Sequence, residues 1–286
     1  MWACDADLAA EYPYYNAITW QVTSTSADPP EEDDDDNNNT GGNTGGGSTG
    51  GGSSTTPSTD NLSPSGVVNH LFRNSIGDDI SLLVGVIDSL MSECAYRAVL
   101  NYLLTGNSFE VIYDPNLGDG TLYGGASASA TSTKLKFRDS TSIKTKAISE
   151  ELYHMYQYRY LNINSLVPMR HLVEFEAHLF RDIAAYVKHG GDDVAAEQDD
   201  HRWACLNLTS SDDEREEYFA FLDSLTSDGT GYNGTTISEE DFRRWANVFG
   251  RISIMYNAVN GGLDYNQAYT MTINNMLYLV NQNCNN

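Results

Sequence analysis

Hydrophobic residues recur at helical spacing over most of the chain beyond residue 66. From Asp78 to Gly106, apolar side chains lie three and four positions apart, two aspartates begin the stretch and a glycine ends it. This pattern predicts one long helix or two shorter ones. On the same grounds, further helices are predicted over 142–161, from Pro168 to the glycines at 190 and 191, and over 210–226, 238–257 and 263–281.

Two short stretches have the alternation of strands rather than the spacing of helices. Residues 109–114, FEVIYD, and 133–139, TKLKFRD, flank a connection rich in Gly, Ala and Ser. They predict a small β-sheet packed beside the helix 142–161. The expected fold class is therefore α+β and mainly helical.

The N-terminal part of the chain differs from the rest in composition. Residues 28–66 form an acidic block followed by a Gly/Ser/Thr-rich tract with almost nothing to bury, which predicts a disordered tether. In the segment 1–27, Cys4 follows a small residue and precedes acidic ones, as in a bacterial lipoprotein after signal-peptide removal. Two interpretations of Cys4 stay open, a lipid anchor and a plain cysteine in an unstructured tail. We expect export to the cell surface or the extracellular space, and a folded domain over 67–286.

Charge and hydropathy limit the classes of partner. The 286 residues include 40 Asp and Glu against 16 Lys and Arg, which gives a formal net charge of −24. Phosphate backbones would repel such a chain, so nucleic acid is not an expected partner. No apolar run approaches the roughly 18 to 20 residues of a spanning helix, so the protein is not expected to be transmembrane. Three further cysteines, Cys94, Cys205 and Cys284, allow one disulfide without indicating its pairing.

The candidate chemistry lies in the helix 142–161. Within EELYH, Glu150 and His154 are four residues apart and share a helix face, and Glu151 lies about 100° around from Glu150. In the HExxH motif two histidines bind zinc and the glutamate between them activates a metal-bound water. Here Glu151 corresponds to that catalytic glutamate and His154 to the second ligand, while Glu150 replaces the first histidine.

The next predicted helix carries EFEAHLF, residues 174–180. Strand, strand, motif helix and carboxylate-bearing helix follow one another as in the gluzincin group of metallopeptidases, whose second helix has an ExxA motif. The stretch 109–190 also resembles uncharacterised tethered bacterial zincin-like proteins with HExxHxYQ and ExEA motifs. The resemblance implies a zincin-like fold, a zinc cofactor and Glu174 as third ligand. Glu176 and His178 are alternative ligands, or groups that hydrogen-bond a ligand.

The resemblance also implies a substrate and a reaction. An active centre would hydrolyse peptide bonds, with a peptide or protein held in extended form along the strand 133–139 as the sheet edge. Two departures from the pattern weaken the centre: Glu150 adds a negative charge that opposes water activation, and His178 stands where related families often have an aspartate. The sequence therefore predicts either a metallopeptidase-like protein with reduced activity or an inactive zincin-fold binding module.

Two other interpretations compete with a zincin. A di-iron carboxylate bundle would use the ExxH pair of Glu151 and His154, but it needs a second ExxH, and EFEAH has a different spacing. A recognition surface could be built from the tyrosines of the motif helix, although such a run is more typical of helix packing. These tyrosines are Tyr153, Tyr156, Tyr158 and Tyr160.

Overall fold

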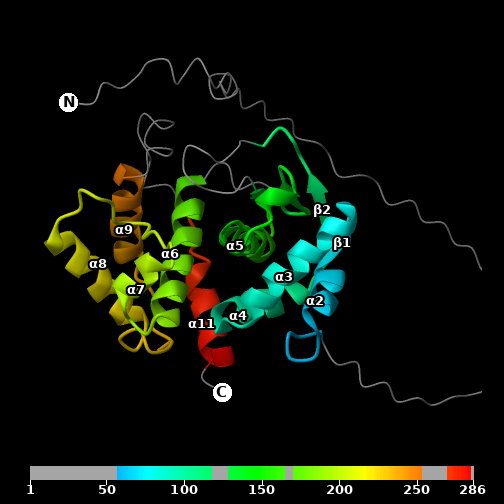
Figure 1. Ribbon diagram of the computed structural model, residues 1–286. Coiled ribbons are helices and arrows are strands. Elements are labelled where there is room, and N and C mark those ends of the chain that lie inside the picture. Colours follow the sequence, from blue (N-terminus) through cyan, green and yellow to red (C-terminus); the bar gives the residue numbers. More distant parts are fainter. Residues whose placement is uncertain (1–56, 118–127, 165–169, 253–268, 285–286) are drawn as a thin grey trace, which may run out of the picture. The chain divides into compact units, whose positions relative to one another are not determined.

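The computed structural model describes residues 57–117, 128–164, 170–252 and 269–284 (Figure 1). The chain divides into two compact units, and all described residues belong to the second, Thr56–Asn286. Cys4 and most of the expected tether lie outside the described residues. The first described helix, α2 (Pro64–Leu71), is capped by the Ser63 hydroxyl, which accepts the Gly66 N–H. Ordered structure therefore begins before residue 67, the expected start of the domain.

Helices make up most of the described part of the chain, as the fold-class prediction requires. Among these residues, none of the helices is long and apolar enough to cross a membrane. After α2 they are α3 (Ile80–Met91), α4 (Cys94–Leu104), α5 (Thr145–Leu161), α6 (Arg170–Lys188), α7 (Asp193–Gln198), α8 (Asp212–Leu225), α9 (Glu239–Ile252) and α11 (Ile273–Cys284).

A four-stranded mixed sheet completes the α+β fold. Its strands are β1 (Phe72–Asn74), β2 (Phe109–Tyr113), β3 (Ala128–Ala130) and β4 (Lys134–Phe137), in the order β1-β2-β4-β3. β1, β2 and β4 run parallel, and β3 pairs antiparallel with β4. The prediction that 133–139 forms the sheet edge is wrong, because the chain just before β4 folds back beside it. β3 holds that edge instead.

Two helix predictions are refined by the structure. The stretch 78–106 forms two main helices, because Glu93 adopts extended backbone angles between α3 and α4. The helix predicted over 263–281 is wrong at its start: Tyr269–Thr272 are not helical, and α11 begins at Ile273. Residues 263–268 lie outside the described part. α6 ends as predicted, since Gly190 and Gly191 follow it with positive φ angles of 63° and 83°.

Helix α5 lies at the centre of the domain. It contacts α3, α4, α6 and β3, and in Figure 1 it is seen almost end on between α6 and α3. Tyr153 and Tyr156 are fully buried, which confirms that these two tyrosines serve helix packing, whereas Tyr158 is partly buried and Tyr160 is exposed. The polar side chains of α5 that face α6 must therefore find partners inside the protein.

A disulfide closes the domain. Cys94 at the start of α4 bonds to Cys284 at the end of α11, across a sequence separation of 190 residues. Cys205 is a buried free thiol. The α4 and α11 helices also pack along each other, so the bond joins elements that are already in contact.

Candidate functional site

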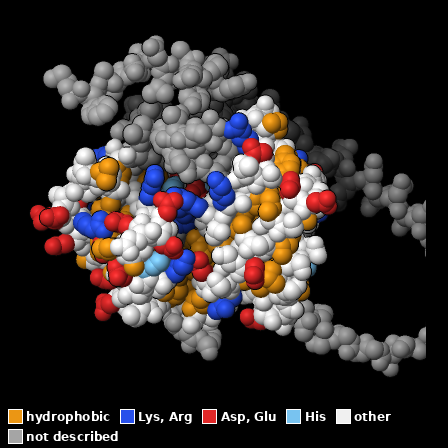
Figure 2. Space-filling view, in the orientation of Figure 1, with side chains coloured by type: hydrophobic (Ala, Val, Ile, Leu, Met, Phe, Trp, Pro, Cys, Tyr) orange, Lys and Arg blue, Asp and Glu red, His pale blue; other side chains and the backbone are white. Residues whose placement is uncertain are grey.

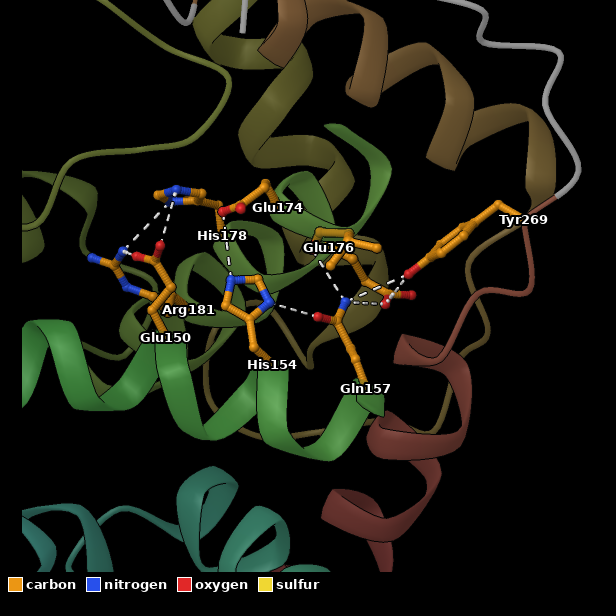
Figure 3. Close-up of polar contacts among 9 residues, drawn as sticks. Glu150, His154, Gln157, Glu174, Glu176, His178, Arg181 and Tyr269 are labelled. Carbon is orange, nitrogen blue, oxygen red and sulfur yellow. Dashed lines mark hydrogen bonds and ion pairs between the residues drawn. The ribbon is translucent and has the colours of Figure 1, made fainter. Parts of the chain in front are cut away.

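The predicted site residues meet where α5 crosses α6. Glu150 and His154 project from α5 towards Glu174 and His178 of α6, as Figure 3 shows. On each helix the two side chains are four residues apart, so each pair lies on one face. The sequence spacing therefore placed these four residues correctly relative to their own helix.

Three of these side chains form a cluster that could hold a metal ion. Glu150, Glu174 and His178 each offer a ligand atom, and these atoms lie within 4.8 Å of one another. Their side chains are partly buried, with exposed fractions of 24%, 16% and 26%. His154 is not one of the three, but its Nε2 lies 3.4 Å from Glu174 Oε2. The spacing does not select zinc over another cation.

Arg181 enters the cluster from one turn further along α6. Its Nη1 lies 2.7 Å from Glu150 Oε2 and 3.4 Å from His178 Nδ1. The side chain is buried, with 7% exposed. Arg181 is not among the residues predicted from the sequence, although its position seven residues after Glu174 puts it on the same helix face. A guanidinium thus contacts two of the three candidate metal ligands.

The charge state of Glu150 follows from these contacts. Burial alone raises the pKa of Glu150, but His178 and Arg181 lower it, and the net shift is below the ordinary value. The pKa of His178 is itself lowered, by burial in the first place and by Arg181. The lowered pKa of His178 favours its neutral form at neutral pH, and Arg181 is the permanent cation beside Glu150.

His154 is oriented by Gln157, another residue that is not among those predicted from the sequence. Gln157 is fully buried and donates its amide hydrogens to Glu176 Oε2 at 2.7 Å and to the Val173 carbonyl at 3.1 Å. Its carbonyl oxygen therefore faces His154 and accepts from Nδ1–H at 2.8 Å. This leaves Nε2 directed at Glu174.

The neighbouring carboxylates determine the proton on His154 Nε2. Burial lowers the pKa of His154, but Glu174, through charge and hydrogen bonding, and Glu151 and Glu150 raise it to about 10. Without a metal ion, His154 is therefore an imidazolium at neutral pH and pairs with Glu174. Any cation bound through Nε2 would have to displace this proton.

Glu151 does not join the cluster of Glu150, Glu174 and His178. Its side chain is 9% exposed and accepts a hydrogen bond from the Ala130 backbone N–H of the edge strand β3. Burial, in the first place, raises the pKa of Glu151 to about 8, although His154 lowers it. In this state Glu151 is protonated at neutral pH, whereas a general base must be ionised to take a proton from water.

Glu176 holds the start of α11. It is fully buried, and its Oε1 accepts the backbone N–H groups of Thr272 at 2.6 Å and Ile273 at 2.9 Å. Its Oε2 accepts from Tyr269, Gln157 and the Thr272 hydroxyl. Because both oxygens are used in this way, we assign Glu176 to the start of α11 rather than to metal binding. Its one link to the cluster runs through Gln157 and His154.

The remaining competing interpretation is not supported by the helix arrangement. In the described part of the chain, the cluster is built from α5 and α6, whereas a di-iron carboxylate bundle draws ligands from four facing helices. Comparisons with protein-family models, curated proteins and solved structures gave no match. The fold and the site together define an α+β, mainly helical domain with a Glu/His cluster between two central helices.

Proposed function

We propose that the chain is a zincin-like binding domain without a catalytic metal. The observation that carries the proposal is the contact of Arg181 Nη1 with Glu150 Oε2 at 2.7 Å. Glu150 occupies the position of the first metal ligand in the HExxH pattern. A guanidinium there supplies, from within the chain, the positive charge that a metal ion would bring.

A count of charges at the crossing supports this role. Arg181 pairs with Glu150, and protonated His154 pairs with Glu174. A divalent cation would add two positive charges and would have to break both pairs. It would also leave the guanidinium of Arg181 buried without its carboxylate, which is unfavourable by several kcal/mol as an order of magnitude. The donor atoms are spaced closely enough to hold a cation, but the charges of the site already balance one another without one.

The state of Glu151 is consistent with a role in binding. A metallopeptidase uses the glutamate of HExxH to take a proton from water. Glu151, with its pKa raised to about 8 by burial, holds its own proton at neutral pH. The domain would then retain the scaffold and its clefts for a peptide or protein partner without cleaving it.

One observation favours a second candidate function, metal-dependent peptide hydrolysis. Glu150, Glu174 and His178 are close enough to hold one ion. With zinc bound by these residues or by His154, the ion would supply Lewis acidity. Glu151 would be the proton acceptor once ionised. This is the activity that the motif order implies.

Zinc content distinguishes the two functions. The full-length protein is loaded with zinc, dialysed and analysed for metal per chain, beside Arg181→Met and Glu174→Ala. We expect far less than one zinc in the parent, and at least about tenfold tighter zinc binding in Arg181→Met, because the repelling charge is gone. Arg215→Met is the matched control, since Arg215 also pairs with carboxylates, Asp193 and Glu197, but on other elements.

Two results would overturn the proposal. One is a stoichiometric zinc in the parent that Glu174→Ala loses. The other is cleavage of a peptide substrate by the parent that Glu151→Gln abolishes. Equal zinc affinity in the parent and in Arg181→Met would show that Arg181 is not what excludes the metal.

The disulfide supports the proposed export of the protein. Disulfides form and persist in oxidising compartments and are rare in reducing ones. The Cys94–Cys284 bond joins α4 to α11. The domain would therefore acquire this bond outside a reducing cytosol. Lipid attachment at Cys4 stays a prediction from the sequence.

A further inference from the structure

A cavity lies beside the α5–α6 crossing and shares Arg181 with it. It has a volume of about 330 Å³ and is lined by residues of α3, α4, α5, α6 and the segment after α7. This volume is at the lower end of the range for small-molecule sites. Figure 2 shows Lys and Arg side chains gathered near the middle of the face drawn, on a molecule that is otherwise rich in acidic residues.

Apart from Asp200 and His201, the charged residues that line the cavity fall into two sets. In the first set, Lys188 pairs with Glu93 at 3.5 Å and with Asp199 at 3.3 Å, and His189 also pairs with Asp199. These charges largely compensate one another. The second set consists of Lys146 and Arg181.

Lys146 is the cation that lacks compensation. Its ammonium has no ion pair or hydrogen bond within the described part of the chain, although its side chain is half-buried. Burial and the charge of Arg181 lower the pKa of Lys146, and Asp200 raises it. Arg181 at the same wall is already paired with Glu150, so the ammonium of Lys146 is the charge left to attract an anion into the cavity.

The N-terminus of α5 adds to the positive potential at this wall. The helix begins at Thr145, which lines the cavity together with Lys146 and Ser149. Its N-cap residue, Lys144, makes no side-chain capping bond, and the first turn has no acidic residue. First-turn N–H groups without a capping side chain favour an anion.

We propose that this cavity binds the terminal carboxylate of a peptide, held by Lys146, Arg181 and the first turn of α5. Leu90, Ala184 and Ala185 supply apolar lining for a small side chain next to the carboxylate. A singly charged carboxylate suits the cavity better than a phosphate, because the acidic side chains of Glu93, Asp199 and Asp200 also line it. This ligand deepens the proposed binding function and rests on it.

The test compares ligands that differ only in the terminal group. Full-length protein is titrated at constant ionic strength with acetyl-Ala-Ala and with its C-terminal amide, while backbone amide signals of Thr145–Ser149 are followed by NMR. We expect the carboxylate form to shift these signals at millimolar concentration and the amide form to leave them unchanged. Lys146→Gln should weaken binding of the carboxylate form at least about tenfold, as expected for loss of a charge-assisted hydrogen bond.

Lys144→Gln is the matched control. It removes an equal charge near the start of the same helix, but Lys144 is exposed and does not line the cavity. We expect the affinity for the peptide carboxylate to change less than about twofold in this variant, because the charge of an exposed lysine is screened by solvent and salt. Thermal unfolding of both variants checks that they remain folded.

Four outcomes would overturn the inference. They are equal binding of the carboxylate and the amide, equal loss in Lys144→Gln and Lys146→Gln, phosphate binding without peptide binding, and acetate binding as tightly as the peptide. The last would mean a site for small free carboxylates. Zinc retention by the parent would overturn the proposed function alone, since Lys146 is not among the candidate metal ligands.

Discussion

At the scale of single residues, the site is a set of titrating groups whose charges depend on one another. Glu151 and His154 both hold their protons more tightly in the folded protein than in the unfolded chain. The pKa of Glu151 is raised from 4.5 to about 8, mainly by burial, and that of His154 from 6.5 to about 10, where carboxylates outweigh burial. Folding is therefore linked to proton uptake at both positions.

This linkage predicts that stability falls as pH rises. The contribution of Glu151 is complete below pH 4.5 and is lost as pH rises through about 8; that of His154 is complete below 6.5 and is lost through about 10. Each group changes the free energy of unfolding by at most about 1.4 kcal/mol per pH unit within its window. Urea unfolding at pH 6, 7, 8 and 9 should show a progressively lower midpoint.

Two variants separate the contributions. Glu151→Gln should remove the part of the fall in stability that lies between pH 4.5 and about 8. His154→Gln should remove the part that lies between pH 6.5 and about 10. Glu150 acts in the opposite direction, because its lowered pKa stabilises the protein at higher pH and that stabilisation is lost on acidification. A midpoint that rose between pH 6 and 9 would contradict the assigned proton states.

At the scale of elements, Glu176 of α6 fixes where α11 begins. Both of its oxygens accept hydrogen bonds, two of them from the backbone N–H groups of Thr272 and Ile273 at the first turn of α11. A carboxylate can accept all of these bonds at once, whereas an amide would turn its NH₂ group towards N–H donors. This contact explains why α11 begins at Ile273 rather than earlier, where sequence periodicity placed it.

We therefore expect Glu176→Gln to destabilise the domain by about 2 kcal/mol or more, since buried donors would be left unsatisfied. The free energy of unfolding from urea titration measures this loss. Glu214→Gln is the control: Glu214 also accepts a backbone N–H at a helix start, that of Ser211, but it is exposed. Glu214→Gln should lower the free energy of unfolding by about 1 kcal/mol or less. Equal effects at both positions would mean that burial of Glu176 contributes little.

At the scale of the whole molecule, the disulfide links the first half of the domain to its end. Cys94 and Cys284 are separated by 190 residues, so the bond closes the domain from α4 to α11 into one loop and leaves α2, β1 and α3 outside it. A closed loop of this size restricts the unfolded chain strongly. The bond therefore adds stability to a domain whose central helix carries several buried polar groups.

Replacing both cysteines by serine should lower the free energy of unfolding by about 2 to 5 kcal/mol. The measurement is urea unfolding of the parent and of Cys94→Ser/Cys284→Ser, each with and without reductant. Reductant should bring the parent close to the double variant and leave the double variant unchanged. A parent that is insensitive to reductant would contradict a stabilising role for the bond.

Much of the fold could be predicted from the sequence because helices and strands follow local periodicity. The pattern of apolar residues placed α5, α6 and α8 to within a few residues, and alternation placed β2 and β4. The pair of glycines after α6 marked its end, because the backbone there adopts positive φ angles, which glycine does without steric cost. Helical spacing also placed Glu150 with His154, and Glu174 with His178, on common faces.

The tertiary structure alone decided which of these groups meet, because contacts across helices depend on packing between segments distant in sequence. The rotation of α6 against α5 brought Arg181 to Glu150, which turned a set of potential metal ligands into a charge-balanced cluster. The return of β3 beside β4 removed the expected edge strand, and the approach of α11 to α4 selected Cys284 as the partner of Cys94. The sequence determined the helices and their polar faces; their packing determined the partners of each charge.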